Sequence, residues 1–227
     1  MLAVVIPAHN EAQSIGACVQ AVRRAAQAPA LRGEPVAVIV VLDACSDATG
    51  IVARKSAALT VTVDARNVGV ARARGAELAL HFGARWLAFT DADTLVAPEW
   101  LAAQLAQGCD AVCGTVAVGD WGSHAERTRL HHDATYHDAD GHRHIHGANL
   151  GVSAAAYRRA GGFSPLHSSE DVALVRALQA CNVTIAWSAA PRVVTSSRRD
   201  YRAPAGFGAA LVRAEQEAQT LAGKAAD

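Results

Sequence analysis

The 227-residue sequence predicts an α/β fold, with a doubly wound and mostly parallel sheet that carries helices on both faces. Two observations support this class. Short runs of aliphatic residues recur along the first half, as in parallel strands that are covered on both faces. Segments with apolar residues at helical spacing separate these runs, so strand and helix alternate as in βαβ units.

Four strands are predicted in the first half, each bounded by turn-forming residues. They comprise Leu2–Ile6, Val36–Leu42, Leu59–Val63 and Trp86–Thr90. A helix is expected after each strand, and Asn10 with Gln13 would form a capping box for the first of them. The other three helices end near Ala57, run over Asn67–Phe82 and start at Pro98.

The second half lacks this regular alternation. Its predicted elements are a strand at Ala111–Val118, helices at Ser153–Ala160 and Glu170–Ala180, strands at Thr184–Trp187 and Arg192–Val194, and a last helix at Gly208–Ala222. The polar, histidine-rich stretch His124–His146 is expected to be a helix or a loop. Because no repeat or linker divides the chain, a single domain over residues 1–227 is expected.

Composition excludes several classes of function. Acidic and basic residues balance at 21 each, so no overall field attracts nucleic acid or an anionic membrane. The five scattered cysteines indicate reduced thiols and a cytoplasmic protein. The first residues lack the basic region of a signal peptide, and no apolar run approaches the roughly twenty residues that cross a bilayer. A peripheral membrane contact stays open.

Asp91-Ala92-Asp93 closes the predicted strand Trp86–Thr90. Two carboxylates two residues apart point the same way from a pleated backbone. Such a pair can bind Mg²⁺ or Mn²⁺ and share the ion with phosphate oxygens. The same residues could also be turn formers with solvated charges, so the other loops at this edge must decide between the two.

The loops after the four strands supply that context, because ligands of open α/β sheets bind beyond the carboxyl ends of the strands. These loops are Pro7–Glu11, Asp43–Asp47, Arg66–Arg72 and Asp91–Asp93. Acidic groups, arginines and helix N-termini at one edge match what a nucleoside diphosphate requires.

Taken together, these segments resemble family 2 glycosyltransferases of the GT-A fold, over about residues 2–200. The similar segments are Val4–Glu11, Asp43–Asp47, Asn67–Arg72, Asp91–Asp93, His146–Asn149 with Gly161–Phe163, and Ser169–Asp171. The turn at 43–47 has one residue fewer between its acids than some members of the family have. The resemblance implies a nucleotide-binding half over residues 1–95 and an acceptor-binding half, with the C-terminal helix, over residues 96–227.

The resemblance also implies a role for each matching residue. The nucleotide-sugar side would be formed by Pro7, Ala8, His9, Glu11, Asp43, Arg66, Arg72, Asp91, Ala92 and Asp93. Within that set, Asp93 would bind the divalent cation directly and Asp91 would lie near the ribose and the ion. The acceptor or donor-sugar pocket would be formed by His146, Gly147, Asn149 and Glu170. Asp171 would be the catalytic base that deprotonates the acceptor hydroxyl.

The expected function is therefore a metal-dependent glycosyltransferase that moves a sugar from a UDP- or GDP-linked donor to an unidentified hydroxyl, with inversion. Two alternatives stay open: a retaining GT-A transferase and a non-catalytic subunit that binds nucleotide sugars. A dinucleotide dehydrogenase is excluded, because no G-x-G-x-x-G follows the first strand.

Three assignments have competing interpretations. Asp171 also fits the first turn of a helix that Ser168 caps. The histidines of residues 131–146 could bind zinc or form a polar acceptor loop. The late stretch Val193–Arg199 offers no histidine as a third metal ligand, which leaves Arg198 and Arg199 to neutralise a diphosphate.

Overall fold

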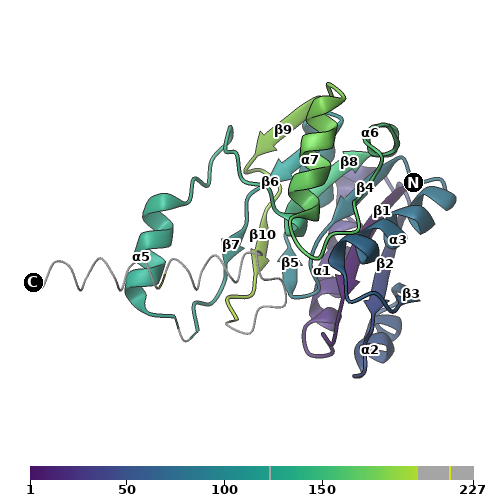
Figure 1. Ribbon diagram of the computed structural model, residues 1–227, viewed down its shortest axis with the longest axis horizontal. Coiled ribbons are helices and arrows are strands. Elements are labelled where there is room, and N and C mark those ends of the chain that lie inside the picture. The colour runs from purple at the N-terminus through teal and green to yellow at the C-terminus, as the bar shows by residue number, and fades with distance from the viewer. Residues whose placement is uncertain (123, 199–214, 216–227) are drawn as a thin grey trace, which may run out of the picture.

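The computed structural model describes residues 1–122, 124–198 and 215, and it contains two sheets (Figure 1). The larger sheet has seven strands in the order β3-β2-β1-β4-β8-β6-β9. Its strands are β1 Leu2–Ala8, β2 Val36–Asp43, β3 Leu59–Val63, β4 Trp86–Phe89, β6 Ala111–Gly114, β8 Leu150–Ser153 and β9 Ile185–Ser188. The smaller sheet pairs β5 Thr94–Val96, β10 Val193–Thr195 and β7 Ala117–Val118, in that order.

The larger sheet is mostly parallel, as the sequence predicts. Strand β1 pairs in parallel with β2 and β4, and β2 pairs in parallel with β3. The exception is β8, which lies antiparallel to both β4 and β6, whereas β6 and β9 are again parallel. The carboxyl ends of β1–β4 therefore meet at one edge of the sheet, and their loops are brought together there.

Helices cover both faces of this sheet, and alternate residues of β1 show the division. Leu2, Val4 and Ile6 face one buried cluster, while Ala3 and Val5 face the other. The first cluster is covered by α1 Ile15–Ala25, α2 Thr49–Lys55 and α4 Trp100–Ala106. The second is covered by α3 Val68–His81, α6 Ala154–Arg159 and α7 Glu170–Ala180. The doubly wound α/β prediction is confirmed.

Of the helix starts predicted at Asn67 and Asn10, the first is confirmed and the second is wrong. Asn67 caps α3 as expected, because its side chain accepts a hydrogen bond from the backbone of Val70. The capping box at Asn10 is wrong: α1 begins at Ile15, and Asn10 has a left-handed backbone with φ of 54°. Asparagine tolerates this conformation, and its side chain bonds to a different loop.

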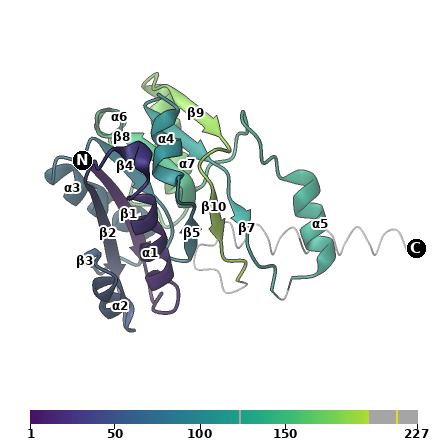
Figure 2. The ribbon, with the colours of Figure 1, turned by 180° about the vertical axis from the view of Figure 1, so that it is seen from behind.

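The second half departs further from prediction. The stretch expected as one strand, Ala111–Val118, forms β6 and β7 in two different sheets, and neither β5 nor β8 was predicted. Within the histidine-rich stretch, Glu126–Thr135 forms helix α5. Figures 1 and 2 show α5 standing away from the larger sheet, with β7 and β10 between them. The expected last helix, Gly208–Ala222, lies outside the described residues.

In the part of the chain that the structure describes, no helix has both the length and the apolar character needed to span a membrane.

Candidate active site

Asp43, at the end of β2, ties two of the sheet-edge loops together. Its side chain accepts backbone hydrogen bonds from Ala65 and Arg66 at 2.8 Å each and from Asn67 at 2.7 Å. Asp43 is only 4% exposed, so these three donors satisfy a carboxylate that is removed from water. The side chain of Arg66 itself is exposed. Asp43 therefore shapes the edge of the site mainly through the loop after β3.

The loop after β1 is fastened to the loop after β2. The Nδ1 atom of His9 lies 2.7 Å from the carbonyl oxygen of Asp43, and the thiol of Cys45 donates to the carbonyl of Ala8 at 3.2 Å. The side-chain oxygen of Asn10 accepts from the backbone N–H of Ser46 at 2.8 Å. The first two loops thus form one unit beside Pro7, at the carboxyl edge of β1 and β2.

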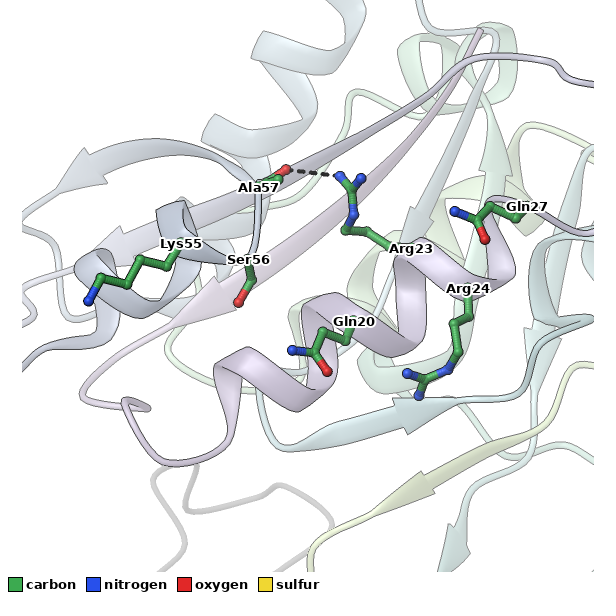
Figure 3. Close-up of a pocket in the computed structure, with 7 residues that line it drawn as sticks. All are labelled: Gln20, Arg23, Arg24, Gln27, Lys55, Ser56 and Ala57. Atoms are coloured by element: carbon green, nitrogen blue, oxygen red, sulfur yellow. Dashed lines mark hydrogen bonds between the residues drawn. The ribbon is translucent and has the colours of Figure 1, made fainter.

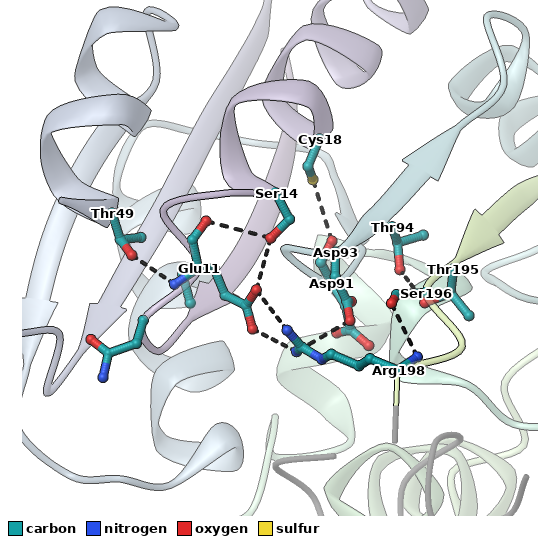
Figure 4. Close-up of polar contacts among 12 residues, drawn as sticks. Glu11, Ser14, Cys18, Thr49, Asp91, Asp93, Thr94, Thr195, Ser196 and Arg198 are labelled. Atoms are coloured by element: carbon teal, nitrogen blue, oxygen red, sulfur yellow. Dashed lines mark hydrogen bonds and ion pairs between the residues drawn. The ribbon is translucent and has the colours of Figure 1, made fainter. Parts of the chain in front are cut away.

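Arg198 lies between two carboxylates of this edge (Figure 4). Its two terminal nitrogens donate to the two oxygens of Glu11 at 3.0 and 2.6 Å, the paired geometry that guanidinium and carboxylate favour. The nitrogen Nη2 also lies 3.2 Å from Oδ2 of Asp93. Sequence spacing places Asp93 at this edge but could not predict a contact between Arg198 and Glu11, which are 187 residues apart.

Arg72 joins two further carboxylates and is buried. Its Nη2 atom lies 2.5 Å from Oδ1 of Asp91, and Nη1 contacts Oε1 of Glu170. The side chain is 4% exposed, and its guanidinium lies 5.9 Å from the ring centre of Phe163. A Cβ atom on Gly147 would collide with the guanidinium, so any other residue there would require Arg72 to shift. Arg72 thus connects the end of β4 to the start of α7.

The charges of this cluster do not balance. Among the described residues, Glu11, Asp91, Asp93 and Glu170 contact two guanidiniums, those of Arg72 and Arg198. Four carboxylates against two arginines leave a formal charge of −2 when all are ionised. Burial, and then the neighbouring Asp91, raise the pKa of Asp93 to about 6, in spite of Arg198.

A divalent cation fits this donor set. Carboxylate oxygens are the ligands that Mg²⁺ and Mn²⁺ prefer, and the ion would offset the excess charge. The protein side chains do not complete a site alone: in residues 1–122, 124–198 and 215, no three acidic, histidine or cysteine side chains are arranged to hold a metal. An ion at Asp93 would need oxygens from water or substrate as well, which suits Mg²⁺ in particular.

Asp171 lies in the first turn of α7, beside the buried cluster. Its oxygens accept hydrogen bonds from the backbone of Gly147 at 2.7 Å and of Val172 at 2.8 Å. The predicted cap at Ser168 is wrong, because Ser169 occupies the N-cap position and its side chain makes no capping bond. The two backbone bonds hold the Asp171 carboxylate in a defined orientation next to the 147–149 segment.

The sequence profile of glycosyl transferase family 2 matches residues 3–161, well over half of the chain. The chain belongs to this family. The protein is thus a glycosyltransferase. The matched segment contains the four loops after β1–β4, whereas Asp171 lies beyond its end. No curated protein matches the chain.

Solved structures of other glycosyltransferases share the fold. Glucosyl-3-phosphoglycerate synthase from Mycobacterium tuberculosis, in complex with Mn²⁺, UDP and glucosyl-3-phosphoglycerate, matches with a TM-score of 0.61 and 18% identity, over 87% of this chain and 72% of that one. S. aureus TarS 1–349 in complex with UDP matches with a TM-score of 0.66 and 14% identity, over 96% of this chain and 71% of that one. These are GT-A folds.

Two residues expected to line a pocket of this glycosyltransferase are buried instead. Asn149 is 1% exposed: its oxygen accepts from Trp100 Nε1 at 2.8 Å, and its nitrogen donates to the carbonyls of Thr115 and Pro191 at 2.7 and 2.8 Å. Its amide therefore stabilises the packing under the site. Glu170 is 3% exposed and pairs with Arg72.

Several histidines of residues 131–146 stack on one another and on the ring of Tyr136. The ring centres of Tyr136 and His144 lie 4.1 Å apart with planes at 10°, and His144 stacks in turn with His142 and His146 at 5.5 and 5.9 Å. His146 Nε2 also lies 2.9 Å from the hydroxyl of Tyr136. Stacked rings do not converge on a shared ion, so this arrangement gives no support to the zinc alternative. Tyr136 was not among the predicted site residues, although an aromatic ring in so polar a stretch was a signal.

A groove of about 380 Å³ lies elsewhere on this glycosyltransferase (Figure 3). It is lined by Gln20, Arg23, Arg24, Gln27, Lys55, Ser56 and Ala57. These residues come from the carboxyl-terminal parts of α1 and α2. Because both helices start at the strand ends that carry the site and run back along the sheet, the groove lies at the opposite edge and is separate from the acidic cluster.

Proposed function

We propose that this family 2 glycosyltransferase uses a UDP-linked sugar and a divalent cation, Mg²⁺ or Mn²⁺, to glycosylate an acceptor hydroxyl with inversion. One observation carries the proposal. Two charge clusters, Glu11–Arg198–Asp93 and Asp91–Arg72–Glu170, meet at the carboxyl ends of β1 and β4, next to the first turn of α7. Cation, diphosphate and base would then be adjacent.

The donor would lie along the loops after β1–β4. Pro7, Ala8, His9, Glu11 and Asp43 would form the side that receives the base and ribose, on the fastened unit of the first two loops. The choice of UDP is supported by the solved neighbours, whose structures contain UDP, UDP-Glc or UDP-GlcNAc. None of these comparisons supports GDP.

Asp93 would bind the cation, and Asp91 would help to position it. When bound, the ion would stabilise the negative charge that develops on the departing diphosphate. The same glucosyl-3-phosphoglycerate synthase was crystallised with Mn²⁺ and with Mg²⁺, each together with UDP. Among the described residues of the cluster, four carboxylates face two guanidiniums, which favours such an ion.

Asp171 would accept the proton of the acceptor hydroxyl while the hydroxyl oxygen attacks the anomeric carbon. The bonds from Gly147 and Val172 keep its carboxylate oriented for this step. A direct attack, with the diphosphate leaving from the opposite side, inverts the anomeric centre. An NMR measurement of the product linkage tests this: an α-linked donor should give a β-linked product, and retention would contradict the mechanism.

Calorimetric titration with UDP tests the donor and the metal together. The wild-type protein should bind UDP more tightly with Mn²⁺ than with a chelator. Asp93→Ala should lose at least about tenfold in Mn²⁺-dependent affinity, since even outer partners of metal sites contribute that much. Asp133→Ala, which removes an exposed carboxylate of α5, should bind like wild type. Equal affinity with and without chelator would refute the metal assignment.

A further inference from the structure

Arg198 follows a segment that hydrogen bonds hold in place, and its own side chain is partly exposed. The preceding residues are fixed: the Thr195 hydroxyl lies 2.9 Å from that of Thr94, and the Ser197 carbonyl lies 2.7 Å from His124 Nε2. The hydroxyl of Ser197 also donates to the carbonyl of Asp120. The Arg198 side chain, in contrast, is 33% exposed.

Arg72, the second arginine of the cluster, is far less exposed than Arg198. The Arg72 side chain is 4% exposed and its partner Glu170 is equally buried, so moving it would leave a buried carboxylate without compensation. Glu11, one partner of Arg198, is also buried, but the Asp93 side chain is 17% exposed and the arginine 33%, so giving up the contact with Asp93 alone costs less. If one of the two arginines changes partners during the reaction cycle, the exposures identify Arg198.

Arg198 also stands where the proposed cation must bind. Its Nη2 atom is 3.2 Å from Oδ2 of Asp93, while a divalent ion binds a carboxylate oxygen at about 2.0–2.2 Å. Two positive groups on one carboxylate repel each other, so the ion and the guanidinium compete for Asp93. A diphosphate would resolve the competition, because its oxygens match the planar fork of an arginine.

We propose that Arg198 is a donor-binding residue that exchanges partners. In the free protein it pairs with Glu11 and Asp93 and opposes binding of the metal alone. When the cation arrives with the donor, the guanidinium moves from Asp93 to the diphosphate, so metal and donor bind together. This inference rests on the proposed function. It adds that donor binding requires Arg198 as well as Asp91 and Asp93.

Two titrations with opposite expected changes test the exchange. Arg198→Ala should bind Mn²⁺ alone more tightly than wild type, because the competitor for Asp93 is gone. The same variant should bind UDP with saturating Mn²⁺ roughly tenfold more weakly, the loss expected for a hydrogen bond between charged groups. Arg198→Lys keeps the charge but not the fork, so it should still oppose Mn²⁺ alone and yet bind UDP less well.

The control is Arg192→Ala, an exposed arginine of the same segment that pairs with Asp138 at 2.6 Å, and it should change neither affinity. The exchange is refuted if Arg198→Ala leaves both affinities unchanged, or weakens both, as general damage to the site would. Failure of the proposed function looks different: wild type and the Arg192 control would then bind no UDP under any condition, and the exchange would fall with it.

Discussion

At the scale of single residues, Arg72 is the side chain on which the packing of the site depends most. It neutralises Asp91 and Glu170, and it fills the space that Gly147 leaves by lacking a Cβ atom. The expectation that it faces the nucleotide must therefore be qualified, because its terminal nitrogens already contact carboxylates. Arg74, two residues further along α3, is half exposed and pairs with Glu77.

Replacing Arg72 by alanine should lower the free energy of unfolding by about 3–5 kcal/mol, the usual result of removing one partner from a buried ion pair. The lower end is expected, because the Asp91 side chain is 38% exposed and water can solvate it. Urea denaturation measures the change. Arg74→Ala should cost less than about 1 kcal/mol, and equal losses in the two variants would contradict the assigned role of Arg72.

Residue roles were predictable from sequence where a short segment determines them. Asp91 and Asp93 could be placed at the sheet edge from the strand before them, and Asn67 could be recognised as a helix cap. The capping box at Asn10 was wrong and the buried contacts of Asn149 were not predicted, because the partners of both side chains come from distant segments. Asn149 bonds residues 34, 42 and 49 positions away, and no spacing within one segment reveals such contacts.

At the scale of elements, the first half was easier to predict than the second. Strands β1–β4 are runs of aliphatic or aromatic residues with helices between them, and each was predicted within a few residues. The unpredicted strands β5 and β8 have only three and four residues, too few to show an alternating pattern. The split of Ala111–Val118 depends on β10, a partner that joins from much later in the chain.

The first turn of helix α7 carries the proposed base, so a substitution of Asp171 tests the role of this element. Asp171→Asn removes the proton acceptor. It keeps one oxygen that can accept from Gly147, but its amide nitrogen cannot accept from Val172 as the second carboxylate oxygen does. The transfer rate should fall by about 10²–10⁴-fold while UDP affinity stays near wild type. The free energy of unfolding should fall by only about 1–3 kcal/mol, for the one backbone hydrogen bond that is lost. Asp133→Asn serves as a control with a normal rate. If Asp171→Asn transfers sugar as fast as wild type, the carboxylate only orders the turn.

At the scale of the whole molecule, the site forms where two parts of the larger sheet meet. The parallel strands β1–β4 supply the acidic loops, and β8 inserts antiparallel between β4 and β6. This insertion brings the 147–149 segment beside α7 and Arg72. Alternation of strand and helix predicts the fold class, but it does not predict strand order, because that order depends on contacts made only after folding. The division into two functional halves stays a prediction.

The stability of the whole molecule should fall as the pH decreases below about 6.5. Burial lowers the pKa of His142 and His144 and lowers that of His146 to about 3. In the unfolded chain these histidines take up protons near pH 6.5, whereas in the folded protein they do so only at lower pH. The unfolded state therefore binds more protons, and His146 alone contributes up to about 1.4 kcal/mol of lost stability per pH unit between about 6.5 and 3.

Urea unfolding at pH 7.5, 6.5 and 5.5 measures the slope of the unfolding free energy against pH. His146→Gln should reduce it, whereas His81→Gln, at an exposed position, should not; an unchanged slope in His146→Gln would contradict the role of this ring.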